Sequence, residues 1–239
     1  MAFQPVLRRR LYQQVAERIE QMIRDGELSE GEALPAEREL MERFAVGRPA
    51  IREALLSLRQ KGLIVLGNGE RARISHPDAD QLIDALSGAA GVYLAKEEGV
   101  RQFQAARQLF EAAIARQAAR IASGEDIARM EKALEANRAA RGHTGRFEMT
   151  DVAFHLEIVR TARNPLLLGV HQALTGWLTE QRSVSLTARG AEASAFDAHE
   201  RIFAAIAARD PDKAEAEMRK HLDSVAAYYW RRARLSRAS

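Results

Sequence analysis

Three of the six histidines lie on apolar faces of predicted helices, where they could bind a metal ion. Asp151 precedes His155 by four residues, so a helix places both side chains on one face. His199 and His221 have similar apolar neighbours on two further predicted helices. One carboxylate oxygen and three imidazole nitrogens suit Zn²⁺, with Ni²⁺, Co²⁺ or Mn²⁺ as alternatives. The other interpretation is three hydrogen-bonded core histidines, because an unpaired polar group is costly to bury.

A second chemistry is indicated by arginines along a predicted helix over residues 48–61. Arg48, Arg52 and Arg59 fall within about 40° of one another at 100° per residue, on a different side from the apolar stripe. Arginine near the start of such a helix suits bidentate pairing with guanine in the major groove. A merely solvated helix surface is the alternative. The apolar stripe consists of Ile51, Ala54, Leu55 and Leu58.

The flanking segments predict the elements that would position this helix. Apolar residues at intervals of three and four predict one helix from Leu11, and a short helix covers residues 36–44. After Gly62 the apolar period changes to two, and strands at 63–66 and 71–75 flank Asn68-Gly69, a strong hairpin signal. This order of elements is that of a winged helix. In it, Arg38 would meet a DNA phosphate, Asn68 and Gly69 the minor groove, and Arg71 the adjacent backbone.

The remainder of the chain has helical spacing only. The predicted fold is mostly α, with an N-terminal winged helix-turn-helix and a C-terminal antiparallel bundle of six or seven helices. His171 follows an apolar run and is interpreted as a hydrogen-bonded helix histidine. We expect helices at 79–90, 98–123, 125–140, 145–163, 165–187, 191–209 and 211–234. The expected divisions are a DNA-binding domain at 1–76, a linker and connecting helix at 77–97, the bundle at 98–234 and a flexible tail at 235–239.

The composition excludes several classes of protein. Lys and Arg number 36 against 33 Asp and Glu, so the formal net charge is only +3 and a histone-like polycation is excluded. The absence of cysteine excludes disulfides and thiolate ligands. No apolar run approaches the roughly 20 residues that span a bilayer, and the N-terminus lacks the apolar core of a signal peptide. We therefore expect a cytoplasmic protein without a membrane partner.

The segment GELSEGEALPAERELMERFAVGRPAIREALLSLRQKGLI resembles the winged-helix domain of the GntR family of bacterial transcription regulators. The resemblance implies that Arg38, Arg48 and Arg52 contact the operator and that Gly69 lies at the wing tip. Ala36 and Gly47 stand where the family usually has serine at a helix N-cap. Ala36 forfeits a cap worth about 1 kcal/mol, whereas Gly47 costs only a few tenths.

The patterns TDVAFH, HERIFAAI and MRKHL resemble the FCD effector domain of the FadR subfamily of these regulators. The resemblance implies an FCD-type bundle in which Asp151, His155, His199 and His221 bind the metal. In ARQLFEAAIARQAA it places Arg107 where many members direct an arginine into the effector pocket. There a guanidinium would hold an effector carboxylate. A solvated or helix-paired arginine is the other interpretation of Arg107.

Within the subfamily, ERELMERFAVGRPAIREAL, GNGERARIS and LTGWL are most similar to the repressors that respond to sialic acid. The similarity suggests N-acetylneuraminate as the effector. Citrate or another small carboxylate, a sugar acid and a folate-type ligand stay open.

Together these features predict a repressor of a catabolic operon. A homodimer would hold a palindromic operator until a small acid binds at the metal site. One alternative is a metal-dependent hydrolase, since three histidines and an aspartate can activate water. Against it, His199-Glu200 does not continue as H-E-x-x-H, and neither a Gly-x-Ser-x-Gly elbow nor a phosphate-binding loop is present. We therefore expect no enzyme activity. A second alternative is an architectural DNA-binding protein that needs no effector.

Overall fold

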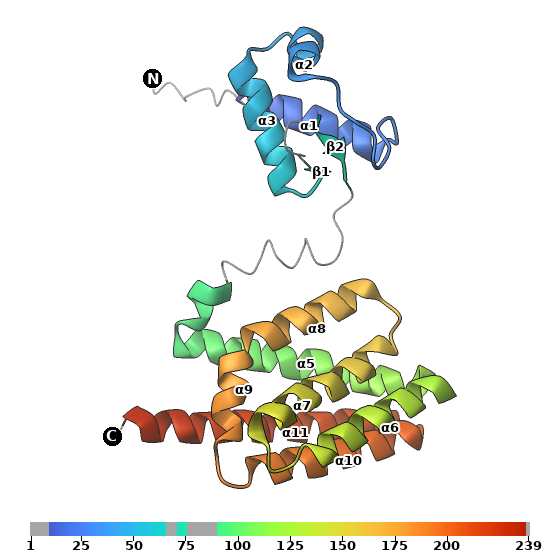
Figure 1. Cartoon of the computed structure of the whole chain (residues 1–239), viewed down its shortest axis with the longest axis vertical. Coiled ribbons are helices and arrows are strands. Elements are labelled where there is room, and N and C mark those ends of the chain that lie inside the picture. Colours follow the sequence, from blue (N-terminus) through green and yellow to red (C-terminus); the bar gives the residue numbers. More distant parts are fainter. Residues whose placement is uncertain (1–9, 66–70, 76–89, 238–239) are drawn as a thin grey trace, which may run out of the picture. The chain divides into compact units, whose positions relative to one another are not determined.

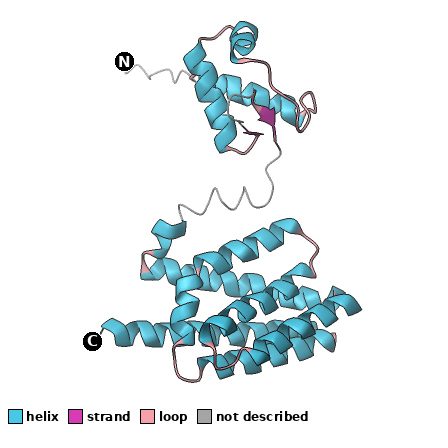
Figure 2. Ribbon diagram, viewed as in Figure 1, coloured by secondary structure: helices cyan, strands magenta, loops and turns pink. Residues whose placement is uncertain are grey.

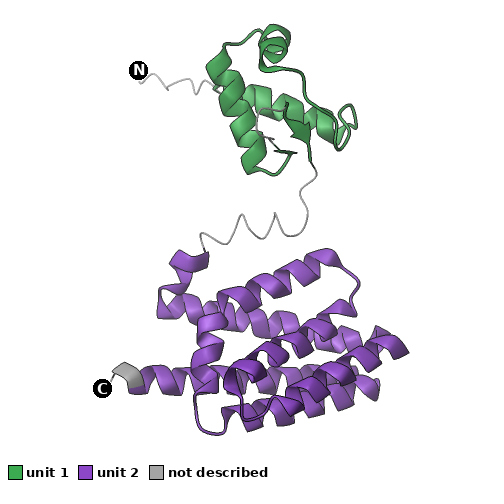
Figure 3. Ribbon diagram, in the orientation of Figure 1, with its two compact units in different colours: residues 1–82 green, residues 83–239 purple. Residues whose placement is uncertain are grey.

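The computed structural model describes residues 10–65, 71–75 and 90–237. The chain divides into two compact units, residues 1–82 and 83–239 (Figure 3). Of the expected connecting helix at 79–90, all but the last residue lies outside the described residues. Residues 90–94 are helical. None of the described helices is both long and apolar enough to cross a membrane.

The first unit is a winged helix-turn-helix, as predicted. Helices α1 (Leu11–Arg24), α2 (Glu37–Phe44) and α3 (Arg48–Gln60) precede an antiparallel pair of strands, β1 (Ile64–Val65) and β2 (Arg73–Ile74) (Figure 1). In this pair Ile64 lies opposite Ile74. The described strands are shorter than the expected 63–66 and 71–75. The tip between them, residues 66–70, lies outside the described residues.

The core of this unit is formed by apolar residues of its helices and of the strand pair. The buried face of α3 contributes Ile51 and Leu58, which pack with Ile19 of α1 and Ile64 of β1. Between α2 and α3 the chain reverses at Ala45, which adopts a left-handed conformation with φ of 51°. Ala36 and Gly47 are the N-caps of α2 and α3 and make no side-chain cap hydrogen bond. The missing caps predicted from the sequence are therefore confirmed.

The second unit is a bundle of helices, as predicted (Figure 2). Helix α5 packs along α11, α10 packs against α11, and α6 packs against α7. Phe147, Phe154, Met130 and Ile202 are fully buried in its core. In the described residues the bundle has seven helices: α5 (Glu97–Ile121), α6 (Gly124–Ala139), α7 (Thr144–Arg160), α8 (Pro165–Trp177), α9 (Thr179–Leu186), α10 (Ala191–Ala207) and α11 (Pro211–Arg237).

Most expected helix ends in this unit lie within three residues of the observed ones, and two of the differences have a physical reason. The single helix expected at 165–187 is two helices, because side chains take over the carbonyl groups at the end of α8. The Thr179 hydroxyl donates to the Gly176 carbonyl at 2.8 Å, and Arg182 Nη2 donates to the Thr175 carbonyl at 2.8 Å. The helix expected to end at 234 continues to Arg237, so residues 235–237 are not tail. No glycine or proline stops it there, and Arg and Leu are good helix formers.

Candidate metal centre and DNA-reading face

The structure brings the four predicted metal-binding residues into one buried cluster. Asp151 and His155 come from α7, His199 from α10 and His221 from α11, and all four are buried. One ligand atom from each lies within 4.8 Å of the others. Because Asp151 and His155 are one helical turn apart, α7 supplies half of the cluster by itself. The packing of α10 and α11 supplies the other half.

The ring nitrogens of this cluster converge on one point. His155 Nε2 lies 3.3 Å from His199 Nε2 and 3.2 Å from His221 Nε2. Asp151 Oδ1 lies 3.3 Å from His199 Nε2. The opposite nitrogen of two of these rings is engaged by a residue that the sequence did not single out. His155 Nδ1 donates to a carboxylate oxygen of Glu111, and His199 Nδ1 donates to Asn137 Oδ1 at 2.9 Å.

Electrostatics favour the protonation states that a metal ion requires. Burial lowers the pKa of His199 and lowers that of His221 well below its ordinary value. Burial acts to raise the pKa of Asp151, but the three neighbouring histidine rings, His199 foremost, outweigh it, so the net pKa is lowered. Near neutral pH the cluster therefore holds an ionised Asp151 beside neutral His199 and His221. Divalent metals bind these forms.

The cluster fits a divalent cation better than it fits a set of hydrogen-bonded core histidines. With Nδ1 of His155 and of His199 each donating outward, neither Nε2 would carry a proton when both rings are neutral, the form that binds a metal ion. Two lone pairs then face one another across 3.3 Å without a hydrogen between them. A cation between them would remove this conflict. Three imidazoles and one carboxylate are a donor set for Zn²⁺ and its neighbours.

A small cavity of about 20 Å³, open to solvent on one side, adjoins the cluster. Asp151 and His221 line it together with Arg107, Arg182 and Tyr228. Arg107 is buried, and its Nε lies 2.5 Å from Glu111 Oε1 one turn along α5. Arg107 is therefore helix-paired, as one interpretation of the sequence held, and it lines the cavity as the other required.

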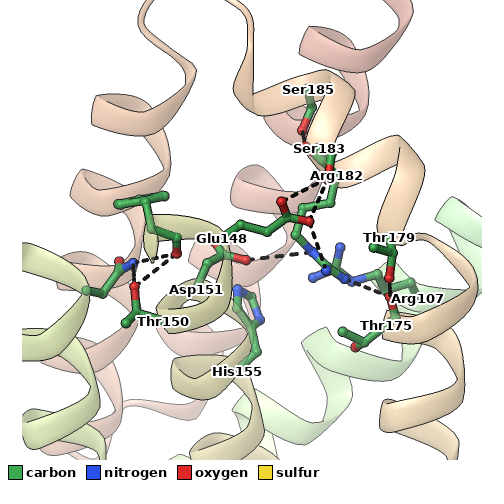
Figure 4. A network of polar contacts seen from close by, with 12 residues as sticks. Arg107, Glu148, Thr150, Asp151, His155, Thr175, Thr179, Arg182, Ser183 and Ser185 are labelled. Atoms are coloured by element: carbon green, nitrogen blue, oxygen red, sulfur yellow. Dashed lines mark hydrogen bonds and ion pairs between the residues drawn. The ribbon is translucent and has the colours of Figure 1, made fainter. Parts of the chain in front are cut away.

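Arg182 is a cavity residue that the sequence analysis missed. It is buried, and it extends from α9 toward Asp151, with its Nε 3.9 Å from Asp151 Oδ2 (Figure 4). This Nε has no hydrogen-bond partner among the described residues. Burial and the nearby Arg107 lower the pKa of Arg182, although the carboxylates of Asp151 and Glu148 lie within 4 Å of it. No sequence signal identified Arg182, because the break between α8 and α9 is what turns it inward.

His171 on α8 is buried, but it is not fully hydrogen-bonded as expected. Its Nδ1 has no hydrogen-bond partner within the described part of the chain and lies 3.8 Å from Glu111 Oε1. Burial lowers the pKa of His171 to about 4, from 6.5. As the pH falls, the unfolded chain takes up a proton on this imidazole before the folded chain does. The stability that the neutral His171 contributes is therefore complete above pH 6.5. It is lost as the pH falls toward 4.

We expect His171→Leu to make the free energy of unfolding less dependent on pH in the acid range. In chelator-treated protein, the free energy of unfolding of the second unit should fall between pH 6.5 and 4. The fall should be smaller in the variant, by up to about 3 kcal/mol. Urea titrations followed by tryptophan fluorescence measure this unit alone, because Trp177 and Trp230 both belong to it. Parallel pH profiles for the two proteins would contradict the assignment.

The predicted reading face of α3 is exposed. Arg48, Arg52 and Arg59 are exposed, whereas the four residues of the apolar stripe are buried. The separation of the two faces predicted from the sequence is therefore confirmed. Arg52 Nε lies 3.2 Å from both carboxylate oxygens of Glu37 at the start of α2. Both side chains of this ion pair are exposed to solvent, 65% for Arg52 and 37% for Glu37.

The remaining predicted DNA contacts are only partly described. Arg38 is exposed on α2, with its Nε 3.8 Å from Glu42 Oε1, and Arg71 is exposed before β2. Asn68 and Gly69 lie outside the described residues. Arg73 Nη1 donates to the Gly31 carbonyl at 3.0 Å, so this neighbouring arginine supports the fold of the hairpin.

Comparisons with known proteins follow the division into two units. Residues 11–74 match the bacterial regulatory proteins of the gntR family, and residues 102–224 match the FCD domain. The HTH-type transcriptional repressor NanR of Cronobacter sakazakii is 42% identical over 223 residues, covering 92% of this chain and 86% of that protein. The protein of that name from Klebsiella aerogenes is 43% identical over 229 residues, covering 95% of this chain and 88% of the relative.

Solved structures agree on the fold. Streptococcus agalactiae GntR matches with a TM-score of 0.57 at 25% identity, over 90% of this chain and 99% of that one. Escherichia coli McbR/YncC matches with a TM-score of 0.52 at 16% identity, over 94% of this chain and 99% of that one, and supports the fold alone.

Proposed function

We propose that this chain, which belongs to the GntR family of bacterial regulatory proteins and carries an FCD domain, is a metal-dependent repressor that responds to a small organic acid. The family consists of transcription regulators rather than enzymes, so the hydrolase alternative is set aside. One observation carries the proposal. The buried cluster of Asp151, His155, His199 and His221 opens onto a cavity lined by two buried arginines.

DNA binding is assigned to the exposed arginines of the first unit. In a homodimer, two copies of α3 would enter successive major grooves of a palindromic operator. Arg48 and Arg52 would contact base edges, with Arg59 farther along the same helix. Arg38, Arg71 and the wing tip at Asn68-Gly69 would contact the backbone and the minor groove.

The metal would be held by the aspartate and the three histidines, and Zn²⁺ fits this donor set best. When bound, the ion would offer its open coordination positions to carboxylate or hydroxyl oxygens of an effector. The charged side chains of the cavity supply the rest of the recognition. Arg107 and Arg182 are the cations of the cavity wall, and the hydroxyl groups of Ser185, Ser194 and Tyr228 lie in the same cavity.

This lining favours a small acid that also bears hydroxyl groups. N-acetylneuraminate meets the description and agrees with the similarity of several segments to sialic-acid-responsive repressors. The NanR relatives support the same choice. Citrate shares the carboxylate and hydroxyl chemistry and is the comparison ligand. Effector binding needs to favour the released arrangement by only about 1–3 kcal/mol to shift operator occupancy.

A thermal-shift experiment tests the proposal. Zinc-loaded protein at an N-acetylneuraminate concentration 100 times Kd should gain about 2.7 kcal/mol of stability, and a chelator should abolish the gain. Arg182→Met should weaken the binding of N-acetylneuraminate ten- to a hundredfold, because one or two charge-assisted hydrogen bonds are lost. Arg189→Met is the matched control, because Arg189 is exposed.

The outcomes separate the alternatives. If citrate stabilises the protein and N-acetylneuraminate does not, the effector assignment is wrong and the site stands. Equal stabilisation with and without the chelator would overturn the link between metal and effector. Purified protein that holds no metal and responds to no acid would support the architectural DNA-binding protein instead.

A further inference from the structure

We infer that Glu111 and Asn137 are positioning residues, which hold His155 and His199 in the one tautomer and orientation that can bind a metal ion. The inference rests on the proposed metal site and concerns two residues outside the donor set. Both are buried, with exposed fractions of 2% and 0%, so water does not compete for their hydrogen bonds. Neither residue is an N-cap or C-cap of the helix on which it lies.

Glu111 fixes His155 because a carboxylate can only accept. Glu111 Oε1 lies 2.5 Å from Nε of the buried, permanently charged Arg107, and this ion pair keeps the Glu111 side chain a carboxylate. The Glu111 oxygen that faces His155 Nδ1 therefore requires a proton on that nitrogen. In the neutral ring, which is the form that binds a metal ion, His155 Nε2 is then the unprotonated nitrogen, and it is the atom that points to the cluster.

Asn137 fixes His199 through the orientation of its amide. Its Nδ2 donates to the backbone carbonyl of Phe147 at 3.4 Å and to Thr150 Oγ1 at 3.0 Å. A backbone carbonyl cannot donate, so the amide nitrogen must face Phe147 and the amide oxygen must face His199. The 2.9 Å contact from Asn137 Oδ1 to His199 Nδ1 therefore places the proton on Nδ1. His199 Nε2 is left unprotonated and faces His155 Nε2.

Glu111 has a second task that Asn137 lacks. Its other oxygen accepts from Arg107 Nε, so one carboxylate holds both a metal-binding histidine and an arginine of the effector cavity. A glutamine at position 111 would offer one acceptor to two donors. If its amide nitrogen turned toward His155, that ring would be driven to the tautomer with the proton on Nε2, which cannot bind a metal.

The experiment measures Zn²⁺ affinity of the full chain by competition with a chromophoric chelator. Glu111→Gln and Asn137→Ala should each weaken zinc ten- to a hundredfold, the usual effect of removing the partner of a metal-binding histidine. Glu217→Gln is the matched control and should change the affinity less than about twofold. Glu217 is buried one turn from His221, but its carboxylate accepts from Arg201 and Lys220 at 2.9 Å each.

A second readout separates positioning from general destabilisation. In zinc-free protein, ¹⁵N NMR should show His155 losing its Nδ1-protonated signature in Glu111→Gln, and His199 losing it in Asn137→Ala. Each variant should leave the other ring unchanged. If Glu111→Gln does not fold, Arg107→Met with Glu111→Leu removes both charges together, and that pair should show the same loss of zinc affinity.

Each result decides something. A wild-type chain with no measurable zinc affinity overturns the proposed metal site and this inference together. A wild-type chain that binds zinc, with variants that match it in affinity and ring tautomer, overturns only the positioning role.

Discussion

His155→Ala is expected to lower Zn²⁺ affinity by at least about a hundredfold, the largest effect of any single substitution in the second unit. His155 Nε2 is the atom that lies within 3.3 Å of both other imidazole nitrogens, so it sits at the centre of the donor set. Its removal leaves three donors and a void in the middle of the site. Isothermal titration of metal-free protein with Zn²⁺ measures the change.

A histidine outside the cluster provides the control for this prediction. His143→Ala removes an exposed imidazole just before α7 and should leave zinc affinity unchanged. Equal zinc affinity for His155→Ala and the wild type would show that the four residues are not the binding site. The measurement is best paired with metal analysis of the protein as purified, which identifies the ion that the cell supplies.

Arg52→Ala is expected to weaken operator binding ten- to a hundredfold and to relax sequence preference at one base pair. A bidentate arginine–guanine contact is worth about 1–3 kcal/mol of discrimination, which is this range of affinity. The side chain is exposed on the predicted reading face of α3. Its ion pair with Glu37 is solvent-exposed and so costs little to exchange for a base. Gel shifts with DNA that the wild-type protein selects from a random pool measure both affinity and preference.

An arginine on another helix controls for loss of charge. Arg24→Ala removes an exposed cation at the end of α1 and should reduce affinity evenly across sequences, if at all. If Arg52→Ala retains both the affinity and the selected sequence, α3 does not read the operator through this residue. A uniform loss, with the preference intact, would instead assign Arg52 to a phosphate.

The main features of both units were predictable because they depend on local spacing. The two stripes on α3 follow from the helical period, so exposed Arg52 and buried Ile51 could be assigned to different faces without a fold. Asp151 and His155 share a face for the same reason. That His199 and His221 join them was an expectation drawn from their apolar neighbours, and it required the bundle to bring one side chain from each of α7, α10 and α11 to the same point.

The missed residues depend on tertiary contacts that spacing does not encode. Glu111 lies four residues after Arg107 on a predicted helix, which is the pattern of an ordinary surface pair. Nothing local marks it as buried or as a partner of His155. Asn137 is one polar residue on a helix rich in them. The inward position of Arg182 could not be predicted without the break between α8 and α9. At this break the Thr179 hydroxyl and the Arg182 guanidinium donate to backbone carbonyls at the end of α8.

The spread of the four cluster residues along the chain has a consequence for the lifetime of the protein. An ion held by the three histidines would link His155 to His199, 44 residues away, and to His221, 66 residues away. This cross-link would be removable. Such a link suppresses the local opening that exposes α10 and α11 to proteases. Copies without the ion would therefore be cleaved sooner than loaded ones by an added protease.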